Sequence, residues 1–66
     1  MAKKQNTVLP DSVAIRLKRE DEGFTQHSLA LKSGYSLRTI GRLEQGVPTY
    51  LSTLKVIAEV LGAEVE

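Results

Sequence analysis

The chain has 66 residues, nine lysines and arginines, eight aspartates and glutamates, and no cysteine, and its formal net charge is +1. A chain of this length makes one small domain, and the lack of cysteine excludes disulfides and thiolate metal sites. No apolar run is long enough to span a membrane, and the first ten residues lack the apolar core of a secretory signal, so we expect a cytoplasmic protein.

Residues 1–10 are polar, show no periodicity and end in Pro10. We predict that they form a flexible N-terminal arm. Lys3 and Lys4 either reach a DNA backbone or belong to a terminus without a role.

The first two helices are predicted over residues 12–22 and 26–33. Asp11 or Ser12 is expected to cap the first helix and Gly23 to end it, and Phe24 is expected to fill the core. Thr25 is the predicted cap of the second helix, because its hydroxyl can accept from the free amides of the next turn.

The next two helices are predicted over residues 37–44 and 51–61, with residues 47–50 as a loop between them. Ser36 is expected to cap the third helix, and Thr49 or Ser52 the last one. The last helix carries a clear apolar stripe, which consists of Leu51, Leu54, Ile57, Ala58 and Leu61. The predicted fold is all-α, a small orthogonal bundle formed by a domain of residues 11–62.

Charge is distributed unevenly along the chain. Acids occupy positions 20–22, whereas residues 23–43 contain Lys32, Arg38 and Arg42 and no acid. A localised basic face is typical of a phosphate-binding surface, although a solvated face of a small helical protein is the alternative.

Residues 25–46 consist of a short helix, a glycine and a second short helix, which predicts a helix-turn-helix. Ala30 is small where the two helices approach each other, and Gly34 relieves the backbone at the turn. Leu29, Ile40 and Leu43 are expected to fix the crossing by packing.

The other side of helix 37–44 is then free, and it is basic and without acids. An α-helix fits the major groove, where an arginine can donate two hydrogen bonds to a guanine. Contact with a phosphate is the alternative for each arginine. Leu37 is expected to touch a thymine methyl group. Gly41 either permits close approach to DNA or relieves crowding. The residues on this side are Leu37, Arg38, Gly41, Arg42 and Gln45.

Residues 13–62 resemble the lambda-repressor-like family, which is also called the Cro/CI or XRE family. Arg19 and Gly23 precede the core of the motif, and Thr53-Leu54, Ile57-Ala58 and Leu61-Gly62 follow it. The matching motif residues are Thr25, Gln26, Leu29, Ala30, Gly34, Ser36, Ile40, Leu43, Glu44 and Gly46.

The resemblance implies roles for individual residues. Gln26 would touch a phosphate or brace a base-reading side chain, and Gln45 would meet a phosphate. Arg19 and Glu44 would form a partly buried ion pair, the alternative being two independent surface charges. The set expected at the DNA is Gln26, Ser36, Leu37, Arg38, Thr39, Gly41, Arg42 and Gln45.

Two features depart from the family pattern. Leu37 occupies a position where relatives often carry a polar reader. Relatives often have a fifth helix, so four to five helices are expected, and here residues 63–66 form a C-terminal tail that alternates apolar and acidic residues. That tail is either frayed or the start of a strand that pairs across a dimer.

These patterns predict a sequence-specific DNA-binding transcriptional regulator, a dimeric repressor that reads the major groove with helix 37–44. The expected dimer interface is Val47, Tyr50, Leu51 and Val60. The alternative is an antitoxin or adaptor of the same fold that docks on a partner protein such as a toxin. An enzyme is not expected, because His27 has no acid partner nearby in sequence, and neither a metal nor another cofactor is implied.

Overall fold

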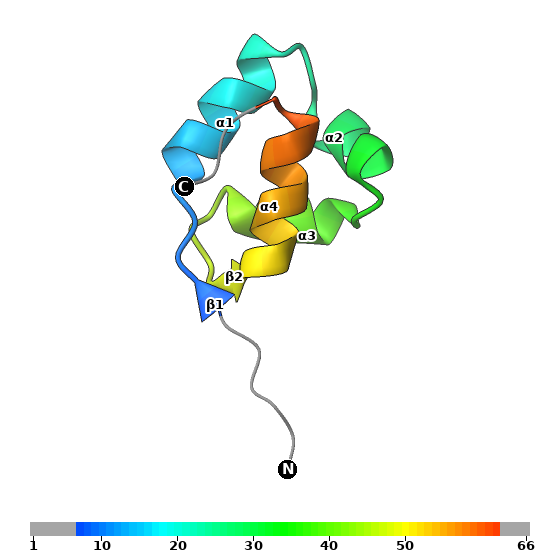
Figure 1. Ribbon diagram of the computed structural model, residues 1–66. Coiled ribbons are helices and arrows are strands. Elements are labelled where there is room, and N and C mark those ends of the chain that lie inside the picture. The colour runs from blue at the N-terminus through cyan, green and yellow to red at the C-terminus, as the bar shows by residue number, and fades with distance from the viewer. Residues whose placement is uncertain (1–6, 63–66) are drawn as a thin grey trace.

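The computed structural model describes residues 7–62, which form four helices and a two-stranded sheet (Figure 1). The elements, in chain order, are β1 (Thr7–Val8), α1 (Ser12–Asp21), α2 (Gln26–Ser33), α3 (Leu37–Leu43), β2 (Thr49–Tyr50) and α4 (Leu51–Val60). Helix α2 packs against both α3 and α4. Figure 1 shows α4 crossing in front of α3, with the sheet at one end of the molecule.

The core forms where the apolar sides of the four helices meet. Leu29, Ile40, Leu43 and Ile57 are fully buried, and they come from α2, α3 and α4. Phe24 packs against this core, as expected, although it is only partly buried. The other buried members of the cluster are Ile15, Ala30 and Leu61, and its partly buried neighbours also include Tyr35, Leu54 and Val60.

Side-chain caps start the first three helices. Asp11 accepts from the amide of Ala14 at 3.1 Å, and Ser36 accepts from the amide of Thr39 at 3.1 Å. Thr25 and Ser28 form a capping box, in which each side chain accepts from the other residue's backbone amide. The predicted starts of α1, α2 and α3 are therefore confirmed, and each hydroxyl or carboxylate satisfies an amide that the helix leaves free.

Helix α4 starts differently from the prediction. Its N-cap is Tyr50, which makes no side-chain capping bond. Thr49 lies in β2 and Ser52 lies inside α4, so neither caps the helix. The predicted cap was wrong because the two residues before α4, Thr49 and Tyr50, form strand β2, so the chain passes directly from a strand into the helix.

The strand pair also corrects the all-α expectation. Thr7 pairs with Tyr50 and Val8 with Thr49, antiparallel. The last part of the expected arm and the expected loop thus form a small sheet next to the four helices. Two-residue strands are too short for alternation to predict them.

The remaining parts of the expected arm and tail, residues 1–6 with Lys3 and Lys4 and residues 63–66, lie outside the described residues. Within residues 7–62, no helix is long and apolar enough to cross a membrane. The same part of the chain holds no group of three or more metal-ligating side chains.

Candidate nucleic-acid interface

Helix α3 has one buried and one exposed side. Ile40 is 0% exposed and Leu43 is 1% exposed. Arg38 and Arg42 are both exposed. Each arginine is two residues from Ile40, which places it about 160° away around the helix. The two guanidinium groups therefore extend from the side of α3 that faces away from the core.

The turn before α3 sets this orientation. Gly34 has φ +83°, the left-handed conformation that glycine adopts without steric cost. Its backbone amide donates to the carbonyl oxygen of Ala30. Ser36 then caps α3, and its hydroxyl also lies 3.1 Å from that of Thr39. A tight turn followed at once by a capped helix lets α3 cross α2 with its apolar side inward.

The outer side of α3 and the adjoining part of α2 are basic. Lys32, Arg38 and Arg42 are all exposed. Within residues 7–62, none of the three has a carboxylate oxygen within 4.0 Å, because the ion pairs found there all involve Lys18 or Arg19. The positive charge of this surface is therefore available to an external anion.

A hydrogen-bonded network ties the end of α3 to α1 and α2. Arg19 donates to both carboxylate oxygens of Glu44, from Nε to Oε2 and from Nη2 to Oε1, and its Nη1 donates to the carbonyl oxygen of Phe24 at 2.8 Å. Gln26 donates to Oε1 of Glu44 at 3.1 Å. The side chains of Arg19 and Glu44 are only 11% and 5% exposed, so the pair is shielded from water.

The charges in this network stabilise one another. Burial tends to raise the pKa of the Glu44 carboxyl, but the hydrogen bonds from Arg19 and Gln26 outweigh it and hold that pKa below its ordinary value. The hydrogen bond to Glu44 raises the pKa of the Arg19 guanidinium. Both groups are therefore charged at neutral pH, and the pair behaves as a fixed link between α1 and α3.

The structure places the remaining candidates at different depths. Leu37 is 48% exposed, and Gln45 is exposed just beyond the end of α3. Gln26 is half-buried and its amide group is held by Glu44, a contact that the sequence did not suggest. Ser36 is exposed while Thr39 is half-buried, and their hydroxyls bond to each other.

Gly41 faces open space. A Cβ added to it would meet nothing within 4 Å. Crowding inside the domain therefore does not explain this glycine. The open space next to α3 leaves the backbone accessible to an external molecule.

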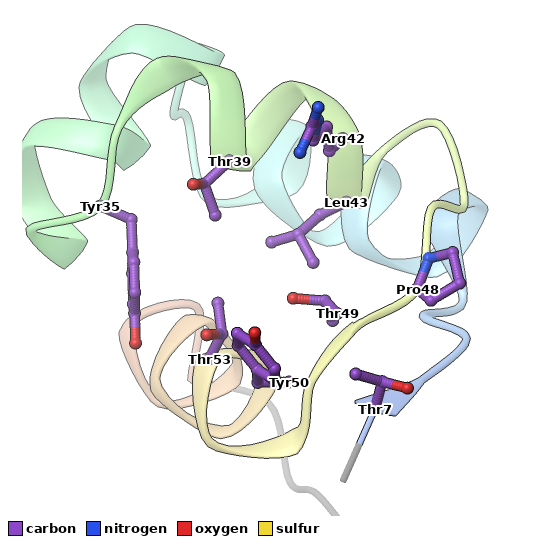
Figure 2. A pocket seen from close by; sticks show the side chains of 9 residues that line it. All are labelled: Thr7, Tyr35, Thr39, Arg42, Leu43, Pro48, Thr49, Tyr50 and Thr53. Carbon is purple, nitrogen blue, oxygen red and sulfur yellow. The ribbon is translucent and has the colours of Figure 1, made fainter. Parts of the chain in front are cut away.

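An open groove of about 410 Å³ lies between α3 and the start of α4 (Figure 2). Thr39 and Leu43 point from α3 toward the opposite wall, which carries Thr49 and Thr53. This wall was not predictable from the sequence, because the strand pair that builds it has no periodic signal. The lining contains no carboxylate, histidine or cysteine. Its residues are Thr7, Tyr35, Thr39, Arg42, Leu43, Pro48, Thr49, Tyr50 and Thr53.

Comparison with known proteins agrees with this geometry. A protein-family model described as helix-turn-helix matches residues 15–66. No curated protein matches the chain. The matched segment contains α2, the Gly34 turn and α3, so the resemblance drawn from the sequence is confirmed. The chain belongs to the helix-turn-helix family of XRE and Cro/CI type, a family of DNA-binding domains.

Proposed function

We propose that the protein is a transcriptional repressor that binds double-stranded DNA as a homodimer, with α3 of each copy in the major groove. The observation that carries this proposal is the pair of exposed guanidinium groups of Arg38 and Arg42, which lie opposite the buried Ile40. An α-helix fits the major groove, and arginine can donate two hydrogen bonds to guanine there.

Three other features of α3 support DNA as the ligand. The exposed methyl groups of Leu37 can contact the methyl group of a thymine. A helix that faced only water would not need an apolar side chain at this position. The space beside Gly41 lets the helix backbone come close to a base pair or a phosphate. Gln45, exposed after the last turn, can donate to a phosphate oxygen.

The network around Glu44 would act as a positioning device. Gln26 and Arg19 hold Glu44 from α2 and α1, so the end of α3 is fixed relative to the rest of the domain. A helix whose orientation is fixed before binding loses less conformational entropy when it enters a groove. In this proposal the side-chain nitrogen of Gln26 braces α3 through its hydrogen bond to Glu44. The side-chain oxygen of Gln26 can then accept a hydrogen bond from another group.

Dimerisation follows from the size of α3. A helix of seven residues contacts few base pairs, and two half-sites about one helical turn apart multiply the affinity. The proposed interface includes Val47 and Tyr50, which are 36% and 48% exposed, with the half-buried Leu51 and Val60 beside them. Light scattering should show a dimer that Tyr50→Glu converts to monomer. A monomer at every concentration, with and without DNA, would reject the dimer.

Selection from random duplex DNA tests the binding mode. The wild-type chain should select a palindromic motif, and Arg38→Ala and Arg42→Ala should each lose preference at one position if they read a base. An arginine that contacts phosphate should instead weaken binding to every sequence alike and reduce the salt dependence. Selection of no motif together with salt-independent binding would reject DNA as the ligand. A reporter under the selected motif should be repressed, and activation would reject the repressor.

A further inference from the structure

The groove between α3 and the start of α4 contains a buried hydroxyl group that the domain itself leaves without a partner. Thr53 lines the groove and is only 7% exposed (Figure 2). Its hydroxyl makes no hydrogen bond with any other described residue. Every side-chain polar atom that is completely buried in the described part of the chain does have a partner. The hydroxyl of Thr53 is therefore reached from the groove, where it is open to a ligand.

The walls of the groove combine hydroxyls with apolar surface. Thr39 on α3 and Thr49 on β2 lie on opposite walls, and each hydroxyl supplies one donor and two lone pairs. Leu43 and the half-buried Tyr35 add apolar surface between them. Sites for small molecules are built in this way, from a largely apolar lining with a few polar groups that orient the ligand.

Arg42 gives the groove its charge. Of the nine residues that line the groove in the described part of the chain, it is the only one with a charged side chain at neutral pH. Its guanidinium has no carboxylate oxygen within 4.0 Å among residues 7–62. The groove is therefore complementary to an anion, and one carboxylate balances one guanidinium through two parallel hydrogen bonds. A phosphate monoester carries nearly two negative charges, which Arg42 alone would not balance.

The size of the groove favours a small ligand. Its volume of about 410 Å³ falls in the range of about 300–1,000 Å³ that is usual for small-molecule sites. A phosphate in a duplex is flanked on both sides by the rest of the backbone, so it cannot easily enter far enough to reach the hydroxyl of Thr53. The buried hydroxyl therefore points to a small molecule and not to DNA.

We propose that the groove binds a small organic carboxylate that also carries a hydroxyl group. The carboxylate pairs with Arg42, the hydroxyl bonds to Thr53, and the apolar body between them lies against Leu43. The ligand acts as an inducer, because a guanidinium that holds the carboxylate is not available to DNA; this regulatory role rests on the proposed DNA binding. Neither Arg42 nor Thr53 belongs to the proposed dimer interface, so both remain accessible in that dimer.

Four small probes test the site on the full chain. Amide chemical shifts are recorded by NMR during titration with 3-hydroxybenzoate, 4-hydroxybenzoate, benzoate and 4-hydroxybenzyl alcohol. At least one hydroxybenzoate should shift the amides of Thr39, Thr49 and Thr53 and bind more tightly than benzoate. The uncharged alcohol should bind about tenfold more weakly than that hydroxybenzoate. No shift at these residues with millimolar hydroxybenzoate, or equal binding of the alcohol, would overturn the proposal.

Two pairs of variants assign the contacts. Arg42→Gln should weaken hydroxybenzoate binding about tenfold, whereas Arg38→Gln should not, because Arg38 is an exposed arginine of the same helix outside the groove lining. Thr53→Val should cancel the advantage of hydroxybenzoate over benzoate, and Ser52→Ala, at an exposed neighbour outside the lining, should preserve it. Equal losses for the two arginine variants, or an undiminished advantage in Thr53→Val, would overturn the proposal.

DNA binding is the separate readout. Hydroxybenzoate should weaken the affinity of the wild type for its selected duplex more than sodium chloride of the same ionic strength does. Without ligand, Thr53→Val should bind the duplex as the wild type does, and a loss would mean that a DNA phosphate occupies the groove, which overturns the proposal. Duplex binding that hydroxybenzoate leaves unchanged would overturn the inducer role. Hydroxybenzoate binding by a chain that selects no duplex would support the carboxylate site and reject the proposed repressor.

Discussion

Ile40 and Leu43 on the inner side of α3 are at most 1% exposed, whereas Arg38 and Arg42 on its outer side face solvent. The inner side and the network around Glu44 stabilise the domain, and a DNA ligand would not touch Ile40 or Leu43. The outer side makes no ion pair among the described residues and adds little to folding. Stability and binding should therefore be separable by substitutions only a few residues apart.

The largest effect is expected from the ion pair that holds α3. Arg19→Ala should lower the free energy of unfolding by about 3 kcal/mol, because it leaves the carboxylate of Glu44 buried without its partner. Lys18→Ala is the control, since its exposed pair with Glu22 is worth about 0.5 kcal/mol or less. Urea denaturation followed by circular dichroism measures both values. Equal losses for the two variants would mean that the pair is no stronger than a surface pair.

Acid should weaken the same link to a smaller extent. The pKa of Glu44 is lowered in the folded state, so its stabilising contribution is complete above the ordinary pKa of a glutamate. That contribution is lost as the pH falls through the lowered pKa. A neutral carboxyl still accepts hydrogen bonds, so the loss should be less than that caused by Arg19→Ala.

Thermal melts of the wild type and of Glu44→Gln between neutral pH and about pH 3 test this dependence, because acid denaturation takes place in that range. The wild type should lose more stability than the variant as the pH falls. Parallel curves for the two proteins would show that Glu44 does not carry the acid dependence.

The smallest effect concerns the outer side. Gly41→Ala should stabilise the domain by about 1 kcal/mol, because alanine favours the helix and its Cβ meets nothing within 4 Å. The same substitution should weaken DNA binding if the helix backbone approaches the duplex there. Gly34→Ala should instead destabilise, since φ is +83° at that position. A stabilised Gly41→Ala variant with full affinity would show that the open space is not used.

The inner side of α3 was predictable because its signals are local. Thr25, Ser36 and Gly34 determine where α2 and α3 begin and where the turn lies, and each acts within a few residues of the chain. The helical period then places Ile40 inward and Arg38 outward. The predicted C-terminal ends of α1, α3 and α4 were each one residue too long, which is typical of helix ends that fray.

Contacts between distant segments were not predictable in the same way. The hydrogen bond from Gln26 to Glu44 depends on the angle at which α2 crosses α3. The spacing of apolar residues along each helix shows which side is buried, but it does not determine that crossing angle. The strand pair joins Thr7 to Tyr50, and neither two-residue segment has a pattern of its own. The groove beside α3 was missed because one wall depends on this pairing.

The strand pair also changes what an N-terminal truncation would do. Tyr50 begins α4 without a capping side chain, and the hydrogen bonds of β1 to β2 hold the backbone at that point. Deleting the chain up to Val8 would remove β1 and its hydrogen bonds to β2. The first turn of α4 would then lose the strand pairing that holds the backbone at Tyr50. Thr7 lines the same groove as Arg42, so a tag fused near Thr7 would start at the edge of that groove.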